Sequence, residues 1–127
     1  MRFPMMRLKQ KLTTIVSEVL NKKAYDPVIL DIKKLSSLAD YFVIVTVDSG
    51  RQAKAVVDSL IIKLKQKGEY PFGVEDTGDT WVVVDYNDII VHIFQKKERE
   101  YYNLEKLWIE AKRVQVDNSS VNGVVRE

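Results

Sequence analysis

Residues 81–94 of this chain read WVVVDYNDIIVHIF, and residues 99–108 read REYYNLEKLW. The first stretch contains two short apolar runs joined by a tight polar connection at 86–88, which predicts an antiparallel β-hairpin. The second stretch carries aromatic residues and leucines at helical spacing, which predicts a helix over about 98–114.

The residues before the hairpin predict two helices and three strands. Ser49 is expected to cap the second helix, and Gly68 is expected to follow its last turn. Residues 41–47 are almost wholly apolar and β-branched, which is typical of a central strand buried on both faces. The predicted helices cover about 8–21 and 50–67, and the predicted strands cover 28–32, 41–47 and 72–75.

The resulting order is α-β-β-α-β-β-β-α, which indicates an α/β fold with a mixed five-stranded sheet flanked by helices. The helix between the second and third strands favours a parallel pairing of those two strands. A chain of 127 residues is expected to form one domain. We expect that domain to cover 1–115, because residues 116–127 are polar and aperiodic and are expected to form a flexible tail.

The composition excludes several classes of function. The chain has no cysteine, so disulfides and thiolate metal sites are excluded. Its 20 basic and 18 acidic residues are nearly balanced, which indicates little or no direct contact with nucleic acid. Residues 1–9 have no apolar run, so we expect no signal peptide, and no apolar run is long enough to span a membrane. We therefore expect a cytoplasmic protein.

Residues for catalysis or metal binding are present only in unconvincing arrangements. Ser49, His92 and Asp85 or Asp40 could nominally form a catalytic triad, but no nucleophile-elbow motif surrounds the serine. Four aspartates near the hairpin match no metal-binding loop; they are Asp76, Asp79, Asp85 and Asp88. We therefore predict no catalytic residue, no metal and no cofactor. The single-glycine loop before residue 51 leaves only a weak anion site at Ser49 and Arg51.

The aromatic residues of the hairpin are better candidates for a protein contact. Trp81 opens a strand directly after an acidic turn, and Tyr86 ends the same strand, so both are expected to be partly exposed. Tyr101, Leu104 and Trp108 are explained by core packing of a helix. His92 shares a strand face with Ile90 and Phe94 and is expected to be a hydrogen-bonded residue rather than a catalyst.

Several blocks of this sequence resemble the ribosomal silencing factor family, also called Iojap-like. They are ADYFVIVT at 39–46, S-x-R at 49–51, GVE at 73–75, the 81–94 stretch and YNLEKLW at 102–108. The resemblance covers about 8–112 and is most specific in DYxDIIVHIF followed by YxLEKLW. The family motif has Gly and His in the 46–52 loop, which reads TVDSGRQ here, and Glu-Gly at 75–76, which is Glu-Asp here. The resemblance therefore rests mainly on the hairpin and the last helix.

The resemblance implies a function and a set of contact residues. Members of the family bind the large ribosomal subunit through its protein fourteen at the intersubunit face, block subunit joining and lower translation under nutrient limitation. Their fold is related to nucleotidyltransferases, but the family is not known for catalysis. The positions that match the motif and are expected at the ribosomal-protein interface are Trp81, Asp85, Tyr86, Asp88, His92 and Tyr102.

Three other interpretations remain open on the sequence alone. The chain could be a nucleotide-dependent enzyme of nucleotidyltransferase type, or an RNA-binding factor in ribosome assembly. The exposed hairpin could also serve a homodimer. Binding of nucleoside triphosphate with Mg²⁺ would distinguish the first interpretation, and steep salt dependence of binding to naked ribosomal RNA would distinguish the second.

Overall fold

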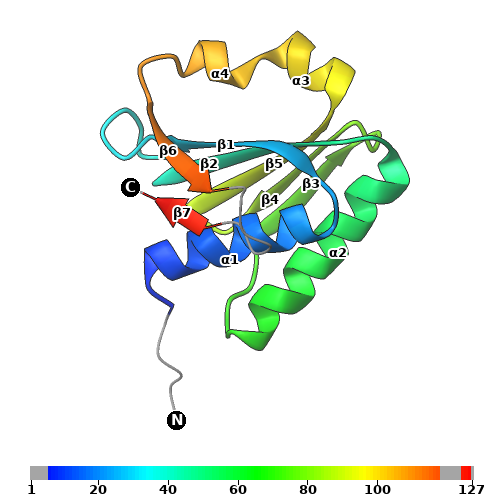
Figure 1. Ribbon diagram of the computed structural model, residues 1–127, viewed down its shortest axis with the longest axis horizontal. Helices are drawn as coiled ribbons and strands as arrows, with labels where there is room; N and C mark the ends of the chain where they lie inside the picture. Colours follow the sequence, from blue (N-terminus) through cyan, green and yellow to red (C-terminus); the bar gives the residue numbers. More distant parts are fainter. Residues whose placement is uncertain (1–5, 118–123, 127) are drawn as a thin grey trace.

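A single mixed β-sheet lies between two layers of helices in the computed structural model, which describes residues 6–117 and 124–126 (Figure 1). α1 and α2 cover one face of the sheet, and α3 and α4 cover the other. The elements in chain order are α1 Leu8–Asn21, β1 Tyr25–Asp31, β2 Tyr41–Val47, α2 Gly50–Gln66, β3 Gly73–Thr77, β4 Trp81–Asp85, β5 Ile89–Gln95, α3 Lys96–Tyr102, α4 Leu104–Leu107, β6 Lys112–Asp117 and β7 Val124–Arg126.

The strands lie in the order β3-β4-β5-β2-β1-β6-β7. β2 runs parallel to β5, whereas the other neighbouring pairs are antiparallel. The α/β class, the hairpin of β4 and β5 and the burial of all seven residues of β2 are confirmed. The predicted parallel pairing of the second and third strands is wrong. The chain leaves α2 through β3 at the edge of the sheet and returns inward through β4, so the parallel partner of β2 is the fifth strand.

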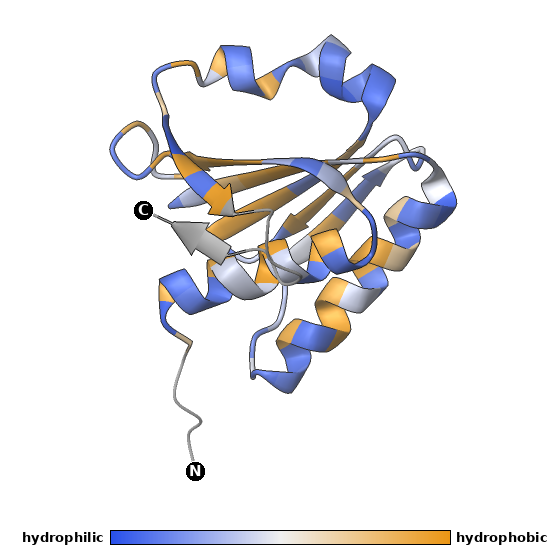
Figure 2. Ribbon diagram, viewed as in Figure 1, coloured by the Kyte–Doolittle hydropathy of each residue, from blue (hydrophilic) through white to orange (hydrophobic). Residues whose placement is uncertain are grey.

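The larger core lies between the sheet and the two long helices. Both helices are amphipathic and bury one stripe each, so their bounds agree closely with the sequence pattern. Figure 2 shows mostly hydrophobic residues along the inner strands of the sheet, and hydrophobic residues alternating with hydrophilic ones along α1 and α2. Ser49 caps α2 by accepting from the Gln52 amide, and Gly68 follows that helix with a φ of 81°, as predicted.

A buried lysine ties this core to the β4–β5 hairpin. Lys11 of α1 is 4% exposed, and its Nζ lies 2.9 Å from a Glu69 oxygen and 2.8 Å from Asp88 Oδ1. The same ammonium lies 5.2 Å from the centre of the Tyr86 ring. Because a buried charge is costly unless it is paired, these contacts fix α1, the segment after α2 and the hairpin turn relative to one another.

The segment after Tyr102 differs from the predicted continuous helix over 98–114. Asn103 has a left-handed backbone with a φ of 46°, and its side chain accepts from the Lys106 amide, so α3 ends there and the short α4 begins. β6 then pairs with β1, with Val114 opposite Ile29. Valines alternate with polar residues at 113–116, and this period of two favours a strand over a helix.

The C-terminal residues extend the sheet beyond the five predicted strands. β6 ends at Asp117 and pairs with β7, which places Val116, Asp117 and 124–126 in strands. β6 thus extends two residues past the predicted boundary at 115, and the flexibility expected of 116–127 stays a prediction. The rest of the expected tail, 118–123 and 127, lies outside the described residues.

Candidate partner-binding surface

The α3–α4 layer leaves part of one sheet face open. α3 packs on β5 and β2, whereas the five residues of β3 are exposed. In the neighbouring β4, Val82 and Val84 are buried, but Trp81, Val83 and Asp85 are only half-buried. Paired residues of antiparallel strands project from the same face, so these three share the face of His92 and Phe94. This open face of the β3–β4 hairpin is the candidate surface.

Trp81 lies at the centre of an aromatic cluster on this surface. Its indole Nε1 donates a hydrogen bond to His92 Nδ1 at 3.2 Å. Its ring centre lies 4.9 Å from that of Phe94 and 4.7 Å from that of Tyr102. Tyr102 is 46% exposed, so one flank of the cluster is accessible to a partner. The prediction that Trp81 is partly exposed is confirmed.

His92 supports Trp81 from beneath. It is 7% exposed, and its ring lies 4.8 Å from the Phe42 ring in an edge-on arrangement. Burial lowers the pKa of His92 to about 4, so the imidazole is neutral at pH 7. A neutral ring whose Nδ1 accepts a hydrogen bond carries its proton on Nε2. The prediction of a hydrogen-bonded histidine is confirmed. The expected place of His92 at the ribosomal-protein interface stays a prediction.

Tyr86 is buried, although the sequence predicted a partly exposed side chain beside Trp81. It is 1% exposed and belongs to the core beneath α1 and α2, on the other side of the sheet from Trp81. Burial, with a smaller contribution from the charge of Glu69, raises the pKa of Tyr86 to about 12. The alternation of side chains along β4 explains the difference, since residues 81 and 86 are separated by an odd number of positions. The expected packing of Tyr86 beside Trp81 is wrong.

The two aspartates of the hairpin also have different surroundings. Asp85 is half-buried on the Trp81 face, where it accepts a hydrogen bond from the Asn87 amide at 2.7 Å. Asp88 pairs with Lys11, and its backbone oxygen accepts from the amides of Asp40 and Tyr41. Trp81 and Tyr102 are therefore in contact, and Asp85 lies on the same face at the other end of β4. Tyr86 lies on the opposite side of the sheet, and Asp88 pairs with Lys11.

Three exposed apolar side chains in α3, α4 and the turn that follows were not predicted from the sequence. Tyr101, Leu107 and Ile109 are 80%, 73% and 73% exposed, respectively. Tyr101 meets Tyr102 edge-on at 5.0 Å, so its exposed ring extends the Trp81 cluster. Tyr101 was expected in the core because one unbroken helix would align it with Leu104 and Trp108. The break at Asn103 removes that alignment, and only Leu104 and Trp108 pack on the sheet.

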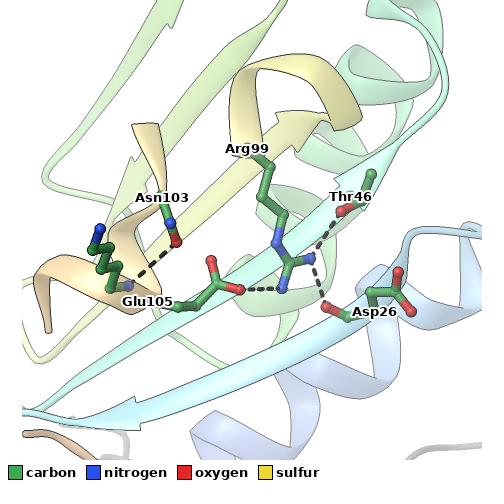
Figure 3. Close-up of polar contacts among 6 residues, drawn as sticks. Asp26, Thr46, Arg99, Asn103 and Glu105 are labelled. Carbon is green, nitrogen blue, oxygen red and sulfur yellow. Dashed lines mark hydrogen bonds and ion pairs between the residues drawn. The ribbon is translucent and has the colours of Figure 1, made fainter. Parts of the chain in front are cut away.

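Arg99 holds the α3–α4 layer in place (Figure 3). Its guanidinium donates to the Asp26 backbone oxygen at 2.6 Å, to Thr46 Oγ1 at 2.8 Å and to a Glu105 oxygen at 3.2 Å. These contacts join α3 to β1, β2 and α4. The residues that make these contacts line a cleft of about 480 Å³ beside the end of β2. Because the guanidinium is engaged within the protein, it acts first as a structural clamp.

The N-terminus of α2, where the sequence predicts a weak anion site, lies beside the side chain of Asp79. Ser49 Oγ accepts from the Gln52 amide, and Arg51 is exposed. The side chain of Asp79 lies so close to Gly50 that a Cβ there would be 2.6 Å from the Asp79 Cβ. A carboxylate already lies beside this helix N-terminus, which disfavours a second anion. Glycine at position 50 permits that close approach of the β3–β4 turn.

The described residues show neither a metal-binding cluster nor a membrane-spanning helix. Between residues 6 and 117 and in 124–126, no group of three or more histidine or acidic side chains is arranged to hold a metal ion. Over the same residues, no helix has the length and apolar character needed to cross a membrane.

Comparison with known proteins identifies the family. A family model described as "Ribosomal silencing factor during starvation" matches residues 6–126. A protein named ribosomal silencing factor RsfS from Halalkalibacterium halodurans is 36% identical over 110 residues, covering 86% of this chain and 94% of that protein. A protein of the same name from Haemophilus influenzae is 46% identical over 88 residues, covering 68% and 85%. A crystal structure from Chromobacterium violaceum superposes with a TM-score of 0.78 at 35% identity, covering 81% and 87%.

The family model spans the sheet, both helical layers and the C-terminal strands. The chain belongs to the ribosomal silencing factor family. The residues that the family model matches, 6–126, include β6 and β7.

Proposed function

We propose that this protein is a non-enzymatic ribosomal silencing factor of the cytoplasm, which binds protein fourteen of the large ribosomal subunit. Binding at the intersubunit face would block joining of the small subunit and thereby repress translation under nutrient limitation. The observation that supports this most directly is the accessible Trp81–Tyr102 cluster in a member of this family. Interfaces commonly combine a central aromatic anchor with a polar rim, and Asp85 supplies an acidic rim group here.

Replacing Trp81 by alanine tests this contact. We expect Trp81→Ala to weaken retention on isolated large subunits by about thirtyfold, because truncation of a central tryptophan costs roughly 2 kcal/mol of binding free energy. Cosedimentation at several protein concentrations would measure the loss. Tyr102→Ala, at a half-exposed position, should also weaken retention while disturbing the core less.

Two variants serve as controls. Ile62→Ala removes a 59% exposed apolar side chain from the opposite helical layer, and Tyr86→Phe removes only a buried hydroxyl. Both should bind like the original protein, with folding checked by circular dichroism. Normal retention of both Trp81→Ala and Tyr102→Ala would refute the contact. A rise in joined ribosomes when these variants replace the original protein would support the blockade.

Self-association through the same surface is a further part of the proposal. A homodimer that uses the Trp81 cluster would compete with the ribosome for the same residues. Sedimentation velocity of the original protein and of Trp81→Ala would detect a dimer that the substitution dissociates.

A further inference from the structure

β3 presents an open strand edge at one margin of the sheet. It pairs with β4 at five consecutive positions, from Gly73 opposite Asp85 to Thr77 opposite Trp81. Within the described part of the chain it pairs with no other strand, and all five of its residues are exposed. Its outer side therefore offers backbone donors and acceptors along about 17 Å, at roughly 3.3 Å per residue.

Of the usual protections against pairing, β3 has acidic side chains but no lysine, proline or β-bulge. Proteins commonly block exposed edges with charged side chains, above all lysine, or with proline or a β-bulge. β3 reads GVEDT, and its pairing with β4 is regular, whereas the β1–β2 pairing is irregular between Tyr25 and Val28. Exposed apolar side chains accompany the edge, with Phe72 77% and Val74 43% exposed. The edge is thus suited to accept another strand.

The charges on β3 select the kind of strand that it can accept. Glu75 lies opposite Val83 and so projects on the Trp81 face, whereas Asp76 lies opposite Val82 and projects on the other. Both faces of the edge are therefore acidic, and Asp79 adds a third carboxylate in the following turn. A second copy of β3 would bring carboxylates together, and the phosphates of RNA would also be repelled. A basic polypeptide has the complementary charge.

We propose that β3 binds an extended, lysine- or arginine-rich segment of a protein partner by adding it to the sheet as an edge strand. The backbone of β3 supplies the hydrogen bonds, and Glu75 and Asp76 pair with basic side chains on either face. This inference rests on the proposed function, since it assigns the segment to a protein of the large subunit. It deepens that function by naming the binding mode and the partner chemistry.

Amide hydrogen exchange with isolated large subunits tests the binding mode. The original protein is measured alone and bound, with the exchange of the peptide covering 73–77 followed by mass spectrometry. Strand addition should slow exchange in 73–77 when the subunit is bound.

Glu75→Lys reverses an exposed charge on the edge and should weaken retention about tenfold. Asp58→Lys makes the same charge change at an exposed position on α2 and should leave retention unchanged.

The outcomes separate this inference from the proposed function. If the protein is retained but 73–77 exchange as in the isolated protein and Glu75→Lys binds normally, strand addition is wrong and the silencing function stands. If naked ribosomal RNA slows exchange in 73–77 as the subunit does, the partner is RNA and the inference is overturned. If the original protein is not retained on large subunits at all, the proposed function and this inference both fail.

Discussion

In the unbound protein, one hydrogen bond and contacts with two neighbouring rings restrain the Trp81 indole. His92 fixes the nitrogen edge at 3.2 Å, while Phe94 and Tyr102 contact the ring. Ordering a side chain at an interface costs conformational entropy, and a restrained side chain has less to lose on binding. The burial of His92 is thus explained by the restraint that it places on Trp81, the residue proposed to contact the partner.

The neutral state of His92 makes stability dependent on pH. Its pKa is about 4 in the folded protein and 6.5 ordinarily, so between these values the unfolded chain binds a proton that the folded protein does not. The free energy of unfolding should therefore fall as pH is lowered from 6.5 to 4, by roughly 3 kcal/mol from this residue. Urea denaturation across this range measures the dependence.

A His92→Leu variant isolates this contribution from that of the carboxylates. It should be less stable than the original protein at pH 7, because Trp81 loses its acceptor, but its stability should fall less between pH 6.5 and 4. Parallel pH dependences of the two proteins would show that His92 is not the group responsible.

At the scale of the element, α3 and α4 depend on tertiary contacts for their position. Neither helix buries any residue completely, and α3 is largely hydrophilic in Figure 2. Short helices are marginal in isolation. The Arg99 clamp and the packing of Leu104 and Trp108 must therefore set where Tyr101 and Tyr102 are presented.

Removing the clamp should loosen this layer. Arg99→Ala leaves Glu105 without its ion pair and the Thr46 and Asp26 oxygens without a donor, so we expect the free energy of unfolding to fall by about 2 kcal/mol. Amide exchange in 96–107 should accelerate, and retention on large subunits should weaken through Tyr102. Lys97→Ala removes a neighbouring exposed cation and is the control. Equal exchange in the two variants would rule out the clamp.

At the scale of the whole molecule, local patterns predicted the elements better than their arrangement. The stripes of α1 and α2, the apolar β2 and the β4–β5 hairpin follow from periodicity within each segment. The position of β3 at the edge follows from which strands pair over long distances, which no local period records. Tyr86 and Tyr101 were misplaced because a strand register and a single left-handed residue decide which way each side chain points.

The C-terminal strands give the last prediction, because they close the β1 side of the sheet. β6 pairs with β1 from Asp31 to Ile29, and Val114 is buried in the main core. A chain ending at Ala111 would expose that edge of β1 and uncover the core, so we expect the free energy of unfolding to fall by about 3 kcal/mol or more. Urea denaturation measures the fall. A chain ending at 123 lacks only β7, so its free energy of unfolding should fall less. Equal urea midpoints for the original protein and both shortened chains would mean that residues 112–127 are a dispensable tail.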